Sequence, residues 1–347
     1  MSGYVRKIAG MAAPTTASST ESRQEELQRG FEQYRRELTG YCYRMLGSGF
    51  EAEDAVQETL VRAWRAIDGF EGRSALRSWL YRIATNVCVD MTRAPQRRAR
   101  PMDLGPSSTA DATLGPALPE HAWVQPIDDR KVLPDGDPAD LVAERESIRL
   151  AFVSALQHLP AKQRAALILR DVLRWQASEV AELLETTTAS VNSALQRARA
   201  TLDSVQRDGG STTAAVEPEQ QELLARYVDA FESYDIAALV ALLRDDVEFS
   251  MPPYDLWLHT PADVAGWLTG TGIGCKGSRL IATSANGGPA FASYRPAGPD
   301  APEGVTHQPF ALQVIEVRDG RISGWHNFLY PELFAAFGLP TELRQPT

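Results

Sequence analysis

Residues with the chemistry of nucleic-acid recognition recur at helical spacing near residue 80. On a helix over residues 75–93, one face carries a set spaced three, four, four and three positions apart: Trp79, Arg82, Asn86, Asp90 and Arg93. An indole that stacks on bases, an amide that bonds a base edge and guanidinium groups that seek phosphates suit melted or single-stranded nucleic acid. The alternative is a solvated basic face, with Trp79 in the core and Asp90 in an ion pair.

A second set of base-reading side chains lies between residues 188 and 202. Four inward positions, Val191, Leu195, Ala198 and Leu202, define a helix that directs outward Asn192, Ser193, Gln196, Arg197 and Arg199. A short helix near 175–184 and the turn 185–188, with Thr187 or Thr188 as N-cap, precede it. This order is typical of a helix-turn-helix, in which Asn and Gln suit adenine and Arg suits guanine. An ordinary helical hairpin is the alternative.

Apolar spacing predicts the helices that carry the first set. One buried stripe is expected from Val56, Leu60, Trp64 and Ile67, and another from Leu76, Leu80, Ile83 and Val87. The first helix also bears the acids Glu51, Glu53, Asp54 and Glu58, which alone indicate only a solvated face. Pro160 predicts a helix start in the next block.

The C-terminal third changes from helices to strands. Two amphipathic helices are expected, one from Leu223, Tyr227, Val228 and Phe231 and one over 236–243. Four β-prone runs follow, at Val247–Met251, Arg279–Ser284, Phe310–Val317 and Ile322–Phe328. The predicted fold class is multidomain, with two all-α domains followed by an α+β domain.

Breaks in composition divide the 347 residues into segments. Residues 95–140 are rich in Pro, Gly, Ala, Ser and Asp without a sustained period, and they predict a linker that is unusually long for a compact domain, functional or disordered. The predicted segments are a disordered leader over 1–22, helical blocks over 23–94 and 141–207 joined by that linker, a flexible joint over 208–217, and the α+β domain over 218–340.

The net charge of −10 combines parts of different sign. Residues 73–100 carry seven arginines and one acid, residues 101–140 carry eight acids and two bases, and residues from 208 onward carry eighteen acids and eight bases. The basic segment is compatible with DNA binding although the whole chain is acidic.

Several classes of protein are disfavoured. No run approaches the roughly 18 apolar residues of a membrane helix, so no membrane span is expected. The cysteines, Cys42, Cys88 and Cys275, have neither metal-ligand spacing nor a disulfide framework, which favours the cytoplasm. There is no phosphate-binding loop or metal motif, so we expect no cofactor, no metal and no nucleotide hydrolysis.

Together, the two helical blocks resemble the group IV, or extracytoplasmic-function (ECF), sigma factors of the sigma-70 family. The resemblance rests on three runs in the family's order: EAEDAVQETLVRAW at 51–64, RSWLYRIATN at 77–86, and LPAKQR at 159–164 with the residues through Leu202. They look like the helix that binds core RNA polymerase, the segment that recognises and melts the −10 element, and the domain that binds the −35 element. The combination is far more specific than any one run.

The resemblance implies a role for each matching residue. Asp54, Gln57 and Glu58 would dock on the clamp helices of the polymerase β′ subunit, with further contacts to the β subunit. Asn86 would contact a flipped −10 base enclosed by the loop Phe70–Ser74. The other −10 contacts would come from Arg73, Trp79, Arg82, Asp90 and Arg93, and the −35 contacts from Asn192, Ser193, Gln196, Arg197 and Arg199. The acidic linker, longer than is usual in the group, would thread a polymerase channel.

Residues 218–340 resemble the SnoaL-like branch of the NTF2-like superfamily, and the fusion is similar to actinobacterial sigma-G-like and sigma-J-like groups. The resemblance implies a cone of helices around a curved sheet that regulates the sigma factor in cis. Such cones often hold a pocket for a small-molecule ligand. The candidate lining residues are Asp246, Tyr254, Trp257, His259, Tyr294, Trp325, His326 and Asn327.

Three functions remain at this point. The first is a polymerase sigma subunit with a cis-acting regulatory domain. The second is a free-standing helix-turn-helix regulator with a ligand-sensing domain, which would bind promoters tightly without polymerase. The third is a SnoaL-type enzyme fused to DNA-binding helices, in which a carboxylate and a histidine do acid–base work. We expect no catalytic residues, because no specific motif fixes an acid–base pair.

Overall fold

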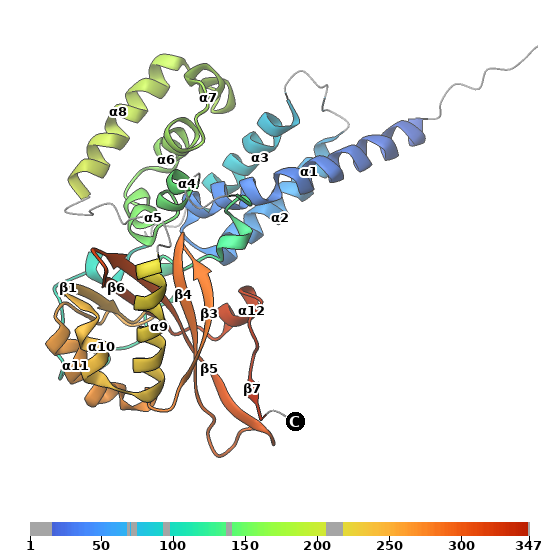
Figure 1. Cartoon of the computed structure of the whole chain (residues 1–347). Coiled ribbons are helices and arrows are strands. Elements are labelled where there is room, and N and C mark those ends of the chain that lie inside the picture. The colour runs from blue at the N-terminus through green and yellow to red at the C-terminus, as the bar shows by residue number, and fades with distance from the viewer. Residues whose placement is uncertain are drawn as a thin grey trace, which may run out of the picture.

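The computed structural model describes residues 16–67, 70, 75–92, 98–136, 141–205 and 218–345, with side chains from residue 29 onward and without that of residue 205. Figure 1 shows a helical half above a helix-and-sheet half. We refer to residues 16–92 as the first block, 98–136 as the linker, 141–205 as the second block and 218–345 as the C-terminal domain.

The first block consists of three long helices, α1 (Thr16–Leu46), α2 (Gly49–Ala66) and α3 (Leu76–Met91). Gly47, with φ at 75°, turns the chain between α1 and α2, and the Ser48 hydroxyl caps α2 by accepting a hydrogen bond from the amide of Glu51 at 3.3 Å. The core between the helices is apolar and fully enclosed, as its members Tyr41, Val56, Leu80 and Val87 show.

The predicted stripe on α2 is partly wrong. Val56 and Ile67 are buried, but Leu60 is half-buried and the Trp64 side chain is 44% exposed. The buried face of α2 instead carries small residues, including Ala52, Ala55, Thr59 and Ala63. Small side chains allow α2 to pack closely on α1, so the larger residues lie at the rim of the interface.

The second block contains short helices: α4 (Val142–Glu146), α5 (Leu150–Leu156), α6 (Ala161–Leu167), a π-helical turn over Ile168–Val172, α7 (Ala177–Leu183) and α8 (Thr188–Val205). Pro160 precedes α6 as predicted. The four expected inward positions of α8 are buried, and the Thr187 hydroxyl accepts a hydrogen bond from the amide of Ser190 at 3.1 Å. Thr187 rather than Thr188 therefore caps the helix.

The C-terminal domain places three helices, α9 (Pro218–Ser233), α10 (Ile236–Ala241) and α11 (Pro261–Thr269), on one mixed sheet. The strand order is β2-β1-β6-β5-β4-β3, with β7 paired to β5, and only β1 and β6 run parallel. The strands are β1 (Leu243–Ser250), β2 (Trp257–Leu258), β3 (Arg279–Ala285), β4 (Gly288–Pro296), β5 (Val305–Arg318), β6 (Arg321–Phe328) and β7 (Leu343–Arg344), and α12 (Glu332–Ala336) follows β6.

The two faces of this sheet belong to different cores. Alternate residues of β4, such as Phe291 and Ala292, point to opposite faces. One face packs under α9–α11 in an aromatic cluster that includes Tyr227, Phe231 and Trp325. The other face joins α12, the linker and both helical blocks in one continuous core. The C-terminal domain is therefore built into the same core as the two helical blocks.

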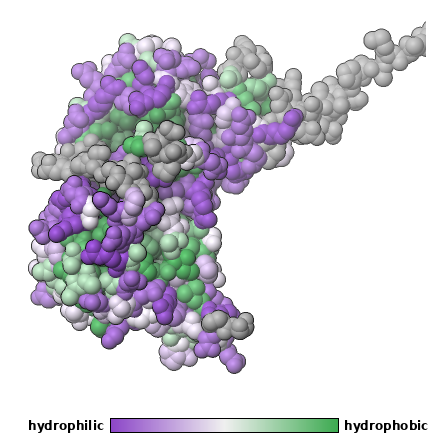
Figure 2. Space-filling view, viewed as in Figure 1, coloured by the Kyte–Doolittle hydropathy of each residue, from purple (hydrophilic) through white to green (hydrophobic). Residues whose placement is uncertain are grey.

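Residues 98–136, which fall within the predicted linker, are ordered and contribute to the core shared with the neighbouring parts of the chain. Trp123, Val124 and Ile127 are almost completely buried, and Gln125 and Asp128 are buried beside them. The segment lies between the first block and the C-terminal domain, so its few apolar residues are enclosed from both sides. Figure 2 shows hydrophilic residues over most of the helical half and an apolar area over the sheet of the lower half.

Candidate polymerase and DNA interface

The predicted −10 residues on α3 lie on one face, and most of them also contact other elements. Trp79 is half-buried against Phe70, with ring centroids 4.8 Å apart. Arg82 lies 3.7 Å from the carboxylate of Glu182 on α7, whereas Asn86 is exposed. Arg73, Ser74 and Arg93 lie outside the described residues.

Asp90 completes this face through a contact with α2. Its carboxylate accepts a hydrogen bond from Arg62 at 3.1 Å, so it does act as an ion-pair partner. Arg62 also donates to Glu58 at 2.7 Å. The end of the predicted −10 helix is therefore tied to the helix that carries the predicted polymerase contacts.

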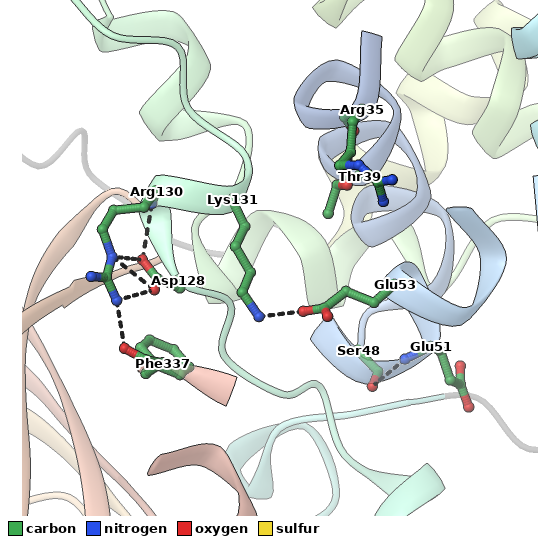
Figure 3. A network of polar contacts seen from close by, with 9 residues as sticks. All are labelled: Arg35, Thr39, Ser48, Glu51, Glu53, Asp128, Arg130, Lys131 and Phe337. Carbon is green, nitrogen blue, oxygen red and sulfur yellow. Dashed lines mark hydrogen bonds and ion pairs between the residues drawn. The ribbon is translucent and has the colours of Figure 1, made fainter. Parts of the chain in front are cut away.

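The predicted polymerase-binding residues remain accessible on α2. Asp54 and Gln57 are exposed, and Glu58 is half-buried beside Arg62. The acids before them are held by the linker: Arg98 forms an ion pair with Glu51, and Lys131 forms one with Glu53. Figure 3 shows the Lys131 contact close to the polar network around Asp128.

The predicted −35 residues are exposed on α8, the helix predicted to read DNA. Asn192, Ser193, Gln196 and Arg197 face solvent on its first half. Arg199 lies further along and donates to Asp171 at 2.7 and 2.9 Å, which raises the pKa of its guanidinium. The first four side chains therefore share a free surface, whereas Arg199 is engaged with the second block itself.

The two blocks are packed against each other through α3 on one side and Trp175, with the helix α7 that follows it, on the other. The rings of Tyr81 and Trp175 have centroids 5.0 Å apart, and the guanidinium of Arg77 lies 5.0 Å from the Trp175 ring. Arg77 also donates to Glu37 on α1 at 3.0 Å. Because Tyr81 and Trp175 are almost fully buried, this contact excludes water between the blocks.

The predicted pocket residues do not converge. Trp325 packs into the aromatic core with Tyr227 and Phe249, whereas Tyr294, on the opposite face, packs on Phe334 and donates to the carbonyl of Pro340. Asn327 donates to the carbonyl of Ser250. The interior of the cone is thus filled by the aromatic cluster around Trp325.

His326 is buried on the opposite face from Trp325. Its Nδ1 lies 2.9 Å from the Ser250 hydroxyl, and its Nε2 lies 3.8 Å from Glu316. Burial lowers the pKa of the imidazole, against the opposing effect of Glu316 and Glu248. The ring is therefore neutral at neutral pH and fills a structural position.

A cavity of about 690 Å³ lies elsewhere, between the second block, the linker and the sheet. Of the eight predicted pocket residues, Asp246 and His259 line it, together with Arg100, Arg199 and Glu316. Tyr254 and Trp257 lie outside its lining. Among the described residues, no group of three or more His, Cys, Asp or Glu could hold a metal ion, and no helix is long and apolar enough to cross a membrane.

The turn between β3 and β4 was not singled out from the sequence, yet it contacts the first block, the linker and the second block. The Asn286 amide donates at 2.6 Å both to the Tyr43 hydroxyl on α1 and to the carbonyl of Ile148 in the second block. Its oxygen accepts from the amide of Ile127 in the linker at 3.2 Å. The available signal was Asn286-Gly287, a dipeptide typical of tight hairpin turns.

The next residue of this turn makes equally close contacts. The Gly287 amide donates to the carboxylate of Asp129 at 2.8 Å. With φ at 76° and a Cβ that would lie 2.8 Å from the carbonyl of Arg145, position 287 accepts only glycine. Burial raises the pKa of Asp129 to about 6, against the lowering effect of the Gly287 and Ser284 hydrogen bonds and of Arg145.

Models of three protein families match the chain in the order of these parts. They are Sigma-70 region 2 over residues 31–98, Sigma-70 region 4 over 149–202, and the SnoaL-like domain over 224–325. The helical blocks and the cone domain thus each match a described family.

Two curated relatives extend over nearly the whole chain. The ECF RNA polymerase sigma factor SigG of Mycobacterium tuberculosis is 43% identical over 340 residues, which cover 97% of this chain and 90% of SigG. The ECF RNA polymerase sigma factor SigJ of the same organism is 27% identical over 327 residues, covering 91% and 96%. The crystal structure of SigJ shares the fold, with a TM-score of 0.58, 24% identity, and coverage of 90% of this chain and 99% of SigJ. The chain therefore belongs to the extracytoplasmic-function family of alternative RNA polymerase sigma factors, with a C-terminal SnoaL-like domain of the NTF2-like fold.

Proposed function

We propose that the C-terminal domain regulates this sigma factor in cis, by holding its two promoter-reading blocks together in a closed form. The observation that carries the proposal is the buried β3–β4 turn. Within this turn, the side chain of Asn286 is hydrogen-bonded to the first block, to the linker and to the second block. These partners are buried. If the side-chain amide of Asn286 were removed, each of them would lose a hydrogen bond that water could not replace.

The closed form cannot engage both promoter elements at once. The names of the elements place them about 25 base pairs apart, or about 85 Å at about 3.4 Å per base pair. In the closed form, the predicted −10 helix α3 instead lies against α7, beside the recognition helix. Promoter binding by both blocks therefore requires that they separate.

The roles of individual residues form part of the proposal. Asp54, Gln57 and Glu58 would bind the β′ clamp helices, with further contacts to the β subunit. Phe70, Arg73, Ser74, Trp79, Arg82, Asn86, Asp90 and Arg93 would serve the −10 element. Asn192, Ser193, Gln196 and Arg197 would read the −35 element, and Arg199 would first have to leave Asp171. Because Asp54 and Gln57 are exposed, the closed form could still bind polymerase through them.

We also propose that the C-terminal domain is regulatory rather than catalytic. The relatives named above are sigma factors, and the buried His326 lies against Ser250 and Glu316 rather than in the lining of the cavity that Asp246 and His259 share. The aromatic core and the buried, neutral His326 support this assignment. The chain would act in the cytoplasm, where it meets RNA polymerase.

Run-off transcription tests the regulation. Purified chain is added to sigma-free core polymerase on genomic promoter fragments, and wild type is compared with Asn286→Gly. Glycine keeps the left-handed turn, where Asn286 has φ of 55°, and removes only the amide. Loss of its buried hydrogen bonds should favour opening and raise the initial rate of promoter-specific transcripts about tenfold.

The matched control is Asp319→Gly in the β5–β6 turn. Asp319 also has a left-handed backbone and precedes a glycine, but it is exposed, and its carboxylate pairs with Arg244 within the same domain. It should leave transcription unchanged. Equal rates for wild type and Asn286→Gly would contradict cis regulation through this turn. Tight promoter binding without polymerase, and no transcripts from any form, would favour a free-standing regulator.

A further inference from the structure

Residues 105–118 of the linker, which we call the strap, lie along the C-terminal domain. Figure 1 shows this part of the linker descending beside β1 and α11. It does not take the direct path between the two helical blocks. The surface beneath it, which we call the strap groove, consists of the loop from Pro253 to the edge strand β2 and one side of α11.

The groove binds the strap mainly through its backbone. The amide of Ser108 donates to the carbonyl of Trp257 at 2.7 Å, and the indole Nε1 of Trp257 donates to the carbonyl of Gly105 at 3.0 Å. Further along, the amide of Leu118 donates to the carbonyl of Pro253 at 2.9 Å. Backbone bonding to the edge of a sheet is a recurrent way to bind an extended peptide.

Side-chain size adds specificity to these backbone contacts. Gly266 in α11 lies so close to the strap that a Cβ built on it would be 2.5 Å from the Cβ of Ala110. The strap supplies small residues at this crossing, and Ala112 and Leu114 pack against the aromatic core of the cone. The groove is thus shaped for a segment with a small residue at the crossing followed by apolar anchors.

We propose that the strap groove is an intramolecular peptide-binding site that retains the linker until the sigma factor opens on polymerase. While residues 105–118 are bound to the C-terminal domain, they cannot contribute length between separating blocks. Their release adds 14 residues, a reach of up to about 48 Å at about 3.4 Å per residue. This inference rests on the proposed opening of the closed form.

Hydrogen exchange in the full chain tests the fit at the crossing. Gly266→Ala favours helix α11 by itself but leaves no room for Ala110. Amide exchange at Ser108 and Leu118 should become about tenfold faster, because overpacking weakens the bound strap. Adding Ala110→Gly restores the space, since the next strap atom is the Cα at 4.0 Å, and should return exchange to the wild-type rate. Unchanged exchange in Gly266→Ala would overturn the proposal.

Run-off transcription tests whether release matters. Gly266→Ala, which crowds the bound strap, should raise the initial rate of promoter-specific transcripts several-fold, and adding Ala110→Gly should return it to the wild-type rate. Equal rates for wild type and Gly266→Ala would overturn the requirement for release. If Asn286→Gly still raises the transcription rate in the same assay, regulation through the β3–β4 turn holds even though the strap proposal fails.

Discussion

Asn86 differs from the other described members of its helical face. Trp79 packs on Phe70, Arg82 approaches Glu182, and Asp90 is bonded to Arg62, so each of these also has a structural contact. Asn86 is exposed. A substitution there changes DNA contacts with little effect on packing, because surface substitutions usually alter stability by less than about 0.5 kcal/mol.

Asn86→Ala should therefore impair opening of the −10 element and spare core binding. Loss of one amide–base contact of about 1–3 kcal/mol corresponds to about a tenfold slower formation of open complex. Permanganate reactivity of promoter thymines measures opening, and comigration with core polymerase on native gels measures binding. An equal loss of both activities would contradict the predicted role and indicate a structural one.

Asp129 gives the interface with the C-terminal domain a pH dependence. Its pKa is about 6 in the folded chain, compared with an ordinary value of 3.8, because burial disfavours the carboxylate. The folded chain therefore binds this proton more tightly than the unfolded chain does. Its contribution lowers stability as the pH rises from about 4 to about 6, and the full cost at neutral pH is about 3 kcal/mol.

Asp129→Asn should remove this cost while its side-chain oxygen still accepts from Gly287. Relative to wild type, the variant should gain about 1 kcal/mol between pH 5 and pH 7, or about 2–4 °C in Tm. Thermal unfolding followed by circular dichroism at several pH values provides the measurement. Parallel Tm curves for the two proteins would show that Asp129 does not titrate in this range.

At the scale of elements, the contact of α3 with Trp175 and the following helix α7 combines a strong and a weak interaction. Trp175 is almost fully buried between Tyr81 and Arg77, whereas the Glu182 side chain that faces Arg82 is 72% exposed. Burial of an aromatic side chain stabilises far more than an exposed ion pair. The rings, rather than the charges, should therefore hold the two blocks together.

Paired substitutions test this ranking. Trp175→Ala should destabilise the closed chain by about 3–5 kcal/mol. Glu182→Ala should cost less than about 0.5 kcal/mol. Urea unfolding gives the free energies, and the rate of limited proteolysis at the block junction reports opening. Similar effects of the two substitutions would mean that the ion pair contributes more than its exposure suggests.

At the scale of the whole molecule, one core joins both helical blocks, the linker and one face of the C-terminal sheet. The β3–β4 turn and the linker contacts to Glu51 and Glu53 add polar contacts to this core, which would hold the free chain in the proposed closed form. The opposite face of the sheet has its own aromatic core under α9–α11. The C-terminal domain can therefore move away as a unit without losing that second core.

Fluorescence energy transfer between the blocks should follow this opening. Donor and acceptor are placed at Arg65→Cys on α2 and Ala200→Cys on α8, both of which are exposed. The free chain should give high transfer, and the complex with polymerase and promoter should give low transfer, as its blocks approach the spacing of about 85 Å between the two elements. High transfer in the active complex would contradict separation of the blocks.

The sequence by itself determined the parts and their order. Helical spacing identified α2, α3 and α8 and the inward residues of α8, and the strand runs identified β1, β3, β5 and β6. The β4 segment escaped notice because its Gly, Ala, Ser and Pro residues have low strand propensity, and its pairing with β3 and β5 decides its structure. The spacing of apolar residues is sufficient to identify a helix or strand when that element buries one of its faces and exposes the other.

Only the tertiary structure decided what lies between the parts. Trp64 is exposed because small residues bring α2 close to α1, and Trp123 is buried because two separate domains enclose it. The predicted pocket residues fall on opposite faces of the sheet, and Asn286 bonds to residues 138 to 243 positions away in the chain. Such contacts depend on how finished elements pack, and no local pattern records a partner that is so distant in sequence.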